Sequence, residues 1–180
     1  MARLTEQDWL DHGLKTLATQ GVGALKASKM AEKLGVSRGS FYWHFEDIHA
    51  FETRLLDRWQ ELTTDETIHE MESEQREAER LPGLMIRALV GRPDLDRAIR
   101  VWAEIDAKAR TKLRKVDALR IGYLRDLLVA SGLAEDQALH RARFIYAASL
   151  GDAAIAPDAS SPFTAAQIRE LAELVCRPGL

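Results

Sequence analysis

Apolar side chains recur at intervals of three and four residues along most of this 180-residue chain, with polar positions between them. That spacing places apolar residues on one face of an α-helix, whereas a strand would alternate at every second position. We find no alternating run of strand length, no internal repeat and no low-complexity tract. The pattern predicts an all-α protein, with helices over residues 5–20, 26–34, 37–45, 47–64, 82–90, 94–105, 113–131, 135–156 and 164–176. The last helix is expected to begin with a capping box of Thr164 and Gln167. The apolar stripe of the first helix comprises Trp9, Leu10, Gly13, Leu14 and Leu17.

The stretch KASKMAEKLGVSRGSFYWHF, residues 26–45, is the most informative part of the pattern. It predicts two short helices joined by a tight turn at Gly35, because a glycine after the last apolar residue supplies the left-handed backbone angle that ends a helix. Ser37 is placed to cap the helix that follows. The facing apolar residues are Met30, Ala31 and Leu34 from the first helix and Val36, Phe41 and Phe45 from the second. This arrangement is a helix-turn-helix.

The outward face of the second short helix carries polar and aromatic side chains suited to a nucleic-acid duplex. Arg38 has the length and the paired donors to read a guanine, and hydroxyl and imidazole groups reach phosphates. Trp43 can pack on sugar or on a thymine methyl. The competing interpretation is that Tyr42 and Trp43 merely complete a small N-terminal core. The predicted DNA contacts are Lys26, Lys29, Ser37, Arg38, Gly39, Ser40, Tyr42, Trp43 and His44.

Charge is divided along the chain in a way that favours DNA at one end. The net charge of −3 argues against a protein that coats nucleic acid indiscriminately. Residues 22–45, however, hold Lys26, Lys29, Lys33 and Arg38 against Glu32 alone, whereas residues 52–79 hold ten acidic residues. Between residues 65 and 80 the apolar signal also thins, which favours a solvated helical face or a loosely ordered connection over an acidic binding site.

The run LGVSRGSFYWHF, preceded by LATQGVGALKASKMAEKLGV, resembles the DNA-binding domain of the TetR family of transcriptional repressors. The resemblance is specific over roughly the first 55 residues. It implies all-helical homodimers that bind a palindromic operator with an N-terminal domain, here residues 1–46. The implied ligand-binding and dimerisation domain is 47–180. Two departures are Ile48, where the family usually has Lys, and Lys26-Ala27, where it favours Thr.

The resemblance also implies a small-molecule pocket in the C-terminal domain. We expect the dimer interface in the last two helices, 135–156 and 164–176, because their small-residue and Leu/Val faces, with Ala138, Ala142 and Ile145 among them, are left over after each helix has contributed to its own core. Aromatic residues on amphipathic helices are more often core residues than ligand contacts, so both interpretations stay open for each candidate. No cofactor is expected, and the effector is not identified. The candidate pocket residues are Trp59, Met85, Leu89, Trp102, Ile105, Tyr123 and Phe144.

Other classes of protein have weaker support in the sequence. His44 and His49 are five residues apart, which does not place both on one helical face as a zinc site would require. Asp106 and Asp117 lie in a basic stretch and are typical of exposed helix ends rather than of an acid and base pair. No common catalytic motif is present, so we expect no enzyme. The alternative to a regulator is a helical small-molecule-binding protein with weak or no DNA binding.

The expected location is the cytoplasm. The single cysteine, Cys176, excludes an internal disulfide and suits a reducing compartment. No window is apolar over the length of a membrane span, and the charged, amphipathic N-terminus does not resemble a signal peptide. We therefore expect an intracellular protein without a membrane anchor.

Overall fold

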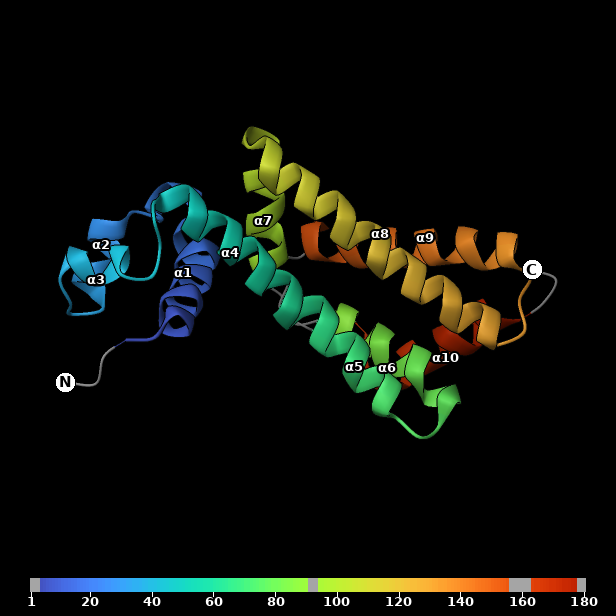
Figure 1. Ribbon diagram of the computed structural model, residues 1–180. Helices are drawn as coiled ribbons and strands as arrows, with labels where there is room; N and C mark the ends of the chain where they lie inside the picture. Colours follow the sequence, from blue (N-terminus) through green and yellow to red (C-terminus); the bar gives the residue numbers. More distant parts are fainter. Residues whose placement is uncertain (1–3, 91–93, 156–162, 178–180) are drawn as a thin grey trace. The chain divides into compact units, whose positions relative to one another are not determined.

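The computed structural model describes residues 4–90, 94–155 and 163–177, and every regular element in these ranges is a helix (Figure 1). The expectation of an all-α protein is confirmed. None of the described helices is long and apolar enough to cross a membrane. The elements are α1 (Glu6–Gln20), the 3-10 helix η1 (Val22–Ala24), α2 (Ala27–Lys33), α3 (Arg38–Tyr42), α4 (Ile48–Gln60), the π-helical segment η2 (Glu61–Asp65), α5 (Glu66–Ser73), α6 (Glu77–Val90), α7 (Asp94–Ile105), α8 (Ala107–Ala130), α9 (Glu135–Ile155) and α10 (Ala165–Cys176).

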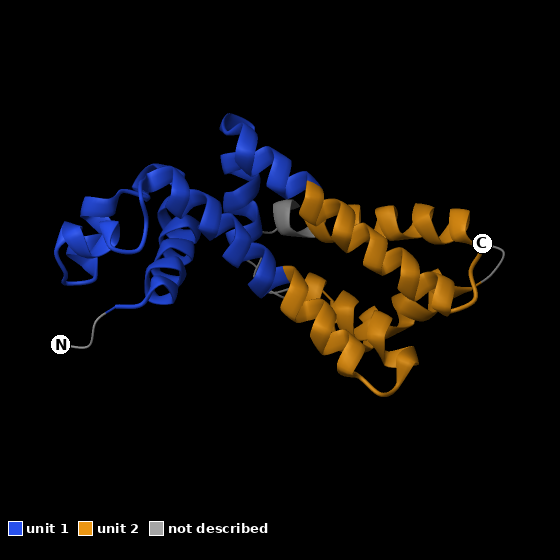
Figure 2. Cartoon of the chain, in the orientation of Figure 1, with its two compact units in different colours: residues 1–63, 93–114 blue, residues 64–92, 115–180 orange. Residues whose placement is uncertain are grey.

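The chain forms two compact units, which are coloured separately in Figure 2. Unit 1 comprises residues 1–63 and 93–114, and unit 2 comprises residues 64–92 and 115–180. Unit 1 therefore contains α1 to α4, α7 and the first turns of α8. The predicted functional division, a DNA-binding domain of 1–46 and a ligand-binding domain of 47–180, is a separate hypothesis and stays a prediction.

Helix α1 supports unit 1 through the apolar stripe that its sequence predicts. Trp9, Leu10, Leu14 and Leu17 are all buried, and α1 packs on α4 and α7. The helix begins with a capping box, in which Thr5 and Asp8 each accept a hydrogen bond from the other's backbone N–H. Such a box satisfies N–H groups that the first helical turn leaves without partners. The predicted stripe is confirmed.

Gly13 allows α1 to approach α4 closely. A Cβ atom at this position would lie 2.5 Å from Phe51 Cζ and 2.9 Å from Leu55 Cδ1, both of which belong to buried side chains. We expect Gly13→Ala to lower the free energy of unfolding by about 1–3 kcal/mol, because the core must shift to admit the methyl group. Urea unfolding followed by circular dichroism measures the change.

The matched control is Gly122→Ala in α8, where a Cβ atom would meet nothing within 4 Å. Both glycines lie inside helices, so both substitutions gain roughly 1 kcal/mol of helix propensity. Gly122→Ala should therefore leave the free energy of unfolding unchanged or raise it. A Gly13→Ala protein as stable as the Gly122→Ala protein would contradict close packing at Gly13.

Unit 2 buries one apolar cluster between α6, α8, α9 and α10, which includes Leu81, Leu128 and Ile168. Arginine side chains bind the free carbonyl groups at the ends of two of its helices. Arg80 donates to the carbonyls of Glu72 and Glu74 at the end of α5. Arg141 of α9 donates to Val175 and Arg177 at the end of α10, at 2.7 and 2.8 Å. These bonds satisfy acceptors that a helix leaves unpaired and place a cation at the negative end of its dipole.

The middle of the chain agrees with one expectation and contradicts another. Residues 66–73 form the regular helix α5, so that of the two interpretations of this stretch the solvated helical face holds and the loose connection does not. Helix α6 begins at Glu77, so that Pro82 lies inside the helix that it was expected to start. Pro82 removes only the backbone bond to Ala78, which is exposed, so that water can bind the freed carbonyl. The predicted stops at residues 91–93 and at Ala156–Pro157 lie outside the described residues.

Candidate nucleic-acid interface

The turn between α2 and α3 has the backbone geometry that its sequence predicts. Gly35 has φ 68°, in the left-handed region, directly after the last residues of α2. The N–H of Val36 donates to the carbonyl of Ala31 at 3.0 Å, and the N–H of Gly35 donates to that of Glu32 at 3.1 Å. This pair of bonds is a Schellman motif, which satisfies the last carbonyls of α2 and turns the chain into α3. The predicted helix-turn-helix is confirmed.

Ser37 occupies the N-cap position of α3 with an extended backbone, φ −72° and ψ 152°, but its side chain makes no capping hydrogen bond. The expectation that the Ser37 hydroxyl caps this helix is therefore wrong. Helix α3 is short, and its backbone bond from Ser40 N–H to the Ser37 carbonyl already closes the first turn. The exposed Ser37 side chain thus remains a candidate for contact with an external group.

The inner face of α3 is held by a cluster of aromatic rings. Phe41 is fully buried, and its ring centroid lies 5.3 Å from that of Trp9, 5.1 Å from that of Phe45 and 5.3 Å from that of Phe51. The Trp9 ring meets Phe41 edge to face, the arrangement that the charge distribution of aromatic rings favours. Because α3 is anchored on this side, the position of its opposite face is also set.

The opposite face of α3 is presented to solvent. Trp43 is 71% exposed and Tyr42 is 45% exposed, so the interpretation of both residues as core aromatics is wrong. Exposed aromatic rings of this size gain little from water and are suited to packing on sugars and bases. Of the other predicted contacts, Ser40 and His44 are half-buried, and the exposed ones are Lys26, Lys29, Ser37, Arg38 and Gly39.

His44 makes a contact that its place in the sequence does not reveal. Its Nε2 lies 2.9 Å from the backbone carbonyl oxygen of Leu4, which can only accept a hydrogen bond, so that Nε2 must carry the proton. His44 thus ties the start of the described chain to the end of α3. Only Nδ1 is left for the predicted phosphate contact, which stays a prediction.

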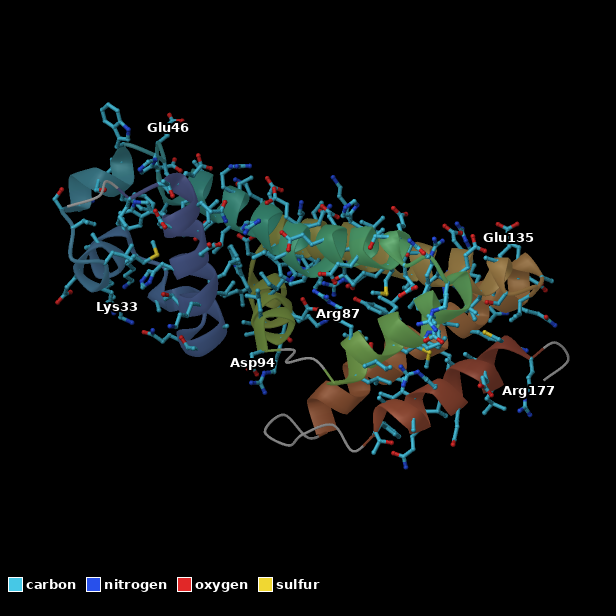
Figure 3. The ribbon with its side chains drawn as sticks, turned by 90° about the horizontal axis from the view of Figure 1, so that it is seen from below. Lys33, Glu46, Arg87, Asp94, Glu135 and Arg177 are labelled. Atoms are coloured by element: carbon cyan, nitrogen blue, oxygen red, sulfur yellow. The ribbon has the colours of Figure 1, made fainter. Side chains whose placement is uncertain are left out.

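Lysine side chains place positive charge near His12 of α1. The pKa of His12 in α1 is lowered from its ordinary value, first by burial and then by the charges of Lys33 and Lys15. Lys33, labelled in Figure 3, ends α2 and is exposed. A cation that disfavours a second positive charge on His12 equally favours a bound anion such as a phosphate.

The first turn of α4 has no cation at residue 48, the position at which TetR family members usually carry a lysine. Ile48 is its first residue and is half-buried. The carboxylate of Asp47 caps the helix by accepting from the Ala50 N–H at 2.7 Å. His49 pairs with Glu52 at 3.0 Å rather than with His44. This end of α4 therefore offers no cation for a phosphate at residue 48.

Three of the candidate pocket residues lie in unit 1. Trp59 is fully buried, and its indole N–H donates to the Asp96 carboxylate at 2.6 Å, which links α4 to α7. Trp102 is also buried. Ile105 is 77% exposed, so the expectation that it lies on an inward apolar stripe is wrong. The spacing of apolar residues in α7 is compatible with more than one buried face. In the structure Ile99 and Trp102 lie on the buried face.

The other candidate pocket residues lie in unit 2. Met85 is buried and Leu89 is partly buried against the same apolar cluster. The Tyr123 hydroxyl is buried and has no hydrogen-bond partner among the described residues. Burial, followed by the charge of Glu72, raises the pKa of Tyr123. Phe144 is 70% exposed, so the expectation of an inward aromatic is wrong there.

Asp106 and Asp117, the two residues weighed as an acid and base pair, have separate structural roles. Asp106 caps α8 by accepting from the Ala109 N–H at 2.7 Å. Asp117 lies within α8 and accepts a hydrogen bond from the Tyr146 hydroxyl at 2.6 Å, so the interpretation of it as an exposed helix end is wrong. No group of three or more His, Cys, Asp or Glu side chains is arranged to hold a metal ion among the described residues.

Arg38 also makes a contact that was not among the predicted ones. The guanidinium Nη2 of Arg38 donates to the Tyr42 hydroxyl oxygen at 2.9 Å. The four-residue spacing of Arg38 and Tyr42 on one helix is the signal that would have predicted it.

Comparison with known proteins gives matches of two kinds. Residues 10–50 match the family described as bacterial regulatory proteins, tetR family. The HTH-type transcriptional regulator AcrR of Shigella flexneri is 41% identical over 46 residues, which cover 26% of this chain and 21% of that relative. The family match includes the helix-turn-helix. The match to AcrR covers about a fifth of that relative's length.

Solved structures match over almost the whole chain at low identity. A TetR transcriptional regulator from Legionella pneumophila gives a TM-score of 0.73 at 13% identity, covering 98% of this chain and 100% of that one. The regulator FadR from Bacillus subtilis, solved in complex with stearoyl-CoA, gives 0.69 at 15% identity, with coverage of 98% and 100%. At these identities the likeness shows the fold alone.

Proposed function

We propose that this chain, which belongs to the TetR family of regulatory proteins and has their helix-turn-helix domain, is a ligand-responsive transcriptional repressor. In this proposal it binds a palindromic operator in double-stranded DNA as a homodimer, in the cytoplasm. A small-molecule effector lowers its affinity for the operator. We assign it no enzymatic reaction and no cofactor.

The observation that carries the proposal is the contrast between the two faces of α3. Its inner face is fastened by the fully buried Phe41, whereas its outer face exposes Arg38, Tyr42 and Trp43. A recognition helix needs this combination, because base edges in the major groove are read by side chains of a firmly placed helix. The exposed Lys26 and Lys29 on α2 supply charge for the flanking phosphates.

A homodimer follows from the size of the recognition element. A helix as short as α3, Arg38–Tyr42, reads only a few base pairs, so a symmetric pair of them gives much greater specificity. The proposed interface is formed by α9 and α10. Phe144 on α9 and Leu171 and Leu174 on α10 are exposed apolar side chains in the single chain, which supports this location.

The proposed effector pocket lies in the C-terminal domain, and the effector itself is not identified. The buried Tyr123 hydroxyl supports a ligand there, because an unpaired buried donor is unfavourable until it finds an acceptor. Met85 and Leu89 would supply apolar contacts. The ligand contacts predicted for Trp59 and Trp102, which are buried in unit 1, stay separate predictions, and the exposed Ile105 and Phe144 are not assigned to this pocket.

The test begins with selection of the preferred DNA sequence from a random duplex library with the intact protein. We expect Arg38→Ala to weaken binding to the selected duplex by about 1–3 kcal/mol and to relax the preference at one position in each half-site. The reason is that a guanidinium donates a pair of hydrogen bonds to a guanine edge, which alanine cannot replace. Fluorescence anisotropy with the selected and a scrambled duplex measures both effects.

Lys29→Ala is the matched control, because Lys29 is an exposed cation on α2 that is predicted to contact only phosphate. It should weaken binding to both duplexes alike and lower the salt dependence by about one counterion. Since both residues are exposed, neither substitution should change the melting temperature. If Arg38→Ala weakens the two duplexes equally, Arg38 is not the base reader.

A second candidate function is a helical small-molecule-binding protein with weak or no DNA binding. The half-buried Ile48 favours it, because no cation stands at the start of α4. The same selection experiment separates the two functions. Recovery of no preferred duplex by the intact protein would favour this second candidate.

A further inference from the structure

Arg38 and Tyr42 lie one turn apart on the exposed face of α3 and contact each other. Besides the hydrogen bond of 2.9 Å, the Arg38 Cζ lies 5.2 Å from the centroid of the Tyr42 ring. The tyrosine thus holds the guanidinium in two ways, through its hydroxyl oxygen and through the face of its ring. An exposed arginine without such a contact samples many rotamers, all but one of which must be given up on binding.

The Tyr42 ring is itself supported by the core of unit 1. It packs edge to face on the Phe41 ring, with centroids 5.3 Å apart and planes at 84°. Phe41 is fully buried and packs in turn on Phe51 of α4. A continuous series of packed rings therefore runs from the interior of unit 1 to the guanidinium. Such support restricts where the guanidinium can lie relative to the axis of α3.

We infer that Tyr42 is a positioning residue that holds Arg38 in the orientation in which it reads a base. The inference rests on the proposed function and replaces the predicted role of Tyr42 as a phosphate contact. Arg38 uses one N–H for Tyr42 and keeps enough donors for the paired hydrogen bonds to a guanine edge. Because the orientation exists before DNA arrives, less conformational entropy is lost on binding.

A double-mutant cycle tests the inference with the intact protein. The proteins are wild type, Tyr42→Phe, Arg38→Ala and the double variant, and the probes are the selected duplex and one in which the base pair read by Arg38 is exchanged. Tyr42→Phe keeps the ring on Phe41 and removes only the hydroxyl, so folding should be preserved. We expect it to weaken the selected duplex roughly three- to tenfold and the exchanged duplex much less.

The decisive comparison is the effect of Tyr42→Phe when Arg38 is already absent. If Tyr42 acts through Arg38, the substitution should then change affinity by less than about twofold. Tyr42→Leu, which also removes the ring, should reduce base preference further while the melting temperature reports any loss of packing on Phe41.

Each other outcome overturns the inference in a recognisable way. If Tyr42→Phe weakens binding by the same factor with and without Arg38, Tyr42 contacts DNA independently. If it leaves base preference unchanged although Arg38→Ala abolishes that preference, the hydroxyl does not position the arginine. A wild-type protein that binds no duplex defeats the proposed function as well, so the two failures are distinguishable.

Discussion

Phe41→Ala should lower the free energy of unfolding of unit 1 by about 3–5 kcal/mol, the usual effect of deleting a buried aromatic ring. Phe41 is fully buried, and its ring touches those of Trp9, Phe45 and Phe51. Alanine would leave a cavity among rigid rings of α1, of α4 and of the segment between α3 and α4, and this cavity cannot easily collapse. Domains are stable by only about 5–15 kcal/mol, so this substitution should remove a large part of the free energy of unfolding of unit 1. DNA binding by the helix-turn-helix should weaken as a result.

The distribution of tryptophan allows this effect to be assigned to unit 1. All four tryptophans of the chain, Trp9, Trp43, Trp59 and Trp102, belong to that unit. Tryptophan fluorescence during urea unfolding therefore follows unit 1, whereas circular dichroism follows helices in both units. We expect Phe41→Ala to lower the urea concentration at the midpoint of the fluorescence transition. The part of the dichroism curve that reports the unfolding of unit 2 should shift less.

Trp43→Ala is the control for Phe41→Ala. It removes a larger aromatic side chain two residues away, but that side chain is 71% exposed. Its effect on the free energy of unfolding should stay below about 1 kcal/mol, because surface substitutions rarely exceed that range. Equal effects of the two substitutions would mean that Phe41 does not carry the core of unit 1.

The N-terminal part of the fold was predictable because its signals are local. Gly35 announces the end of α2 since few other residues adopt φ 68° without strain. Helix α1 has a single apolar face that can pack against the core, and all the residues predicted on that face are buried. In α10 the pair Thr164 and Gln167 forms the predicted capping box. Each of these features depends on residues within a turn or two of one another.

Side-chain pairs of the candidate site were less predictable than its location. The outward face of α3 follows from the inward positions of Phe41 and Phe45. That Arg38 turns back onto Tyr42, or that His44 reaches the Leu4 carbonyl, depends on rotamers and on contacts forty residues apart in the chain. The four-residue spacing places Arg38 within reach of Tyr42 but does not fix its rotamer, and no spacing in the sequence indicates the contact of His44 with Leu4.

In unit 2 the sequence leaves the choice of face open. Helix α9 has apolar residues on most sides, and the predicted dimer face included Ala138, Ala142 and Ile145. All three are buried in the chain's own core, so the expectation that they remain free for a partner is wrong. Among the side chains of α9 that the structure describes, the large apolar one that is exposed is instead Phe144. Only tertiary packing decides which of two apolar faces turns inward.

This outcome changes which substitution tests the proposed homodimer. Ala142 has no exposed surface, so Ala142→Glu should bury a charge without a partner and unfold unit 2 rather than separate two folded chains. Phe144 is 70% exposed and Leu171 is 36% exposed. A glutamate at either of these positions can be solvated in a single chain but not in an apolar interface. Glutamate substitutions at these two positions therefore test association of two chains without unfolding either chain.

We expect Phe144→Glu and Leu171→Glu, singly or together, to convert the dimer into folded monomers, as measured by light scattering after size-exclusion chromatography. Affinity for the selected palindromic duplex should then fall by at least about 100-fold, because two linked recognition helices bind with an avidity that a single helix lacks. Ala107→Glu is the control, since Ala107 is exposed at the first turn of α8, outside α9 and α10. It should leave both mass and affinity unchanged. Dimers that persist in the double variant, with an unchanged circular dichroism spectrum, would place the interface elsewhere.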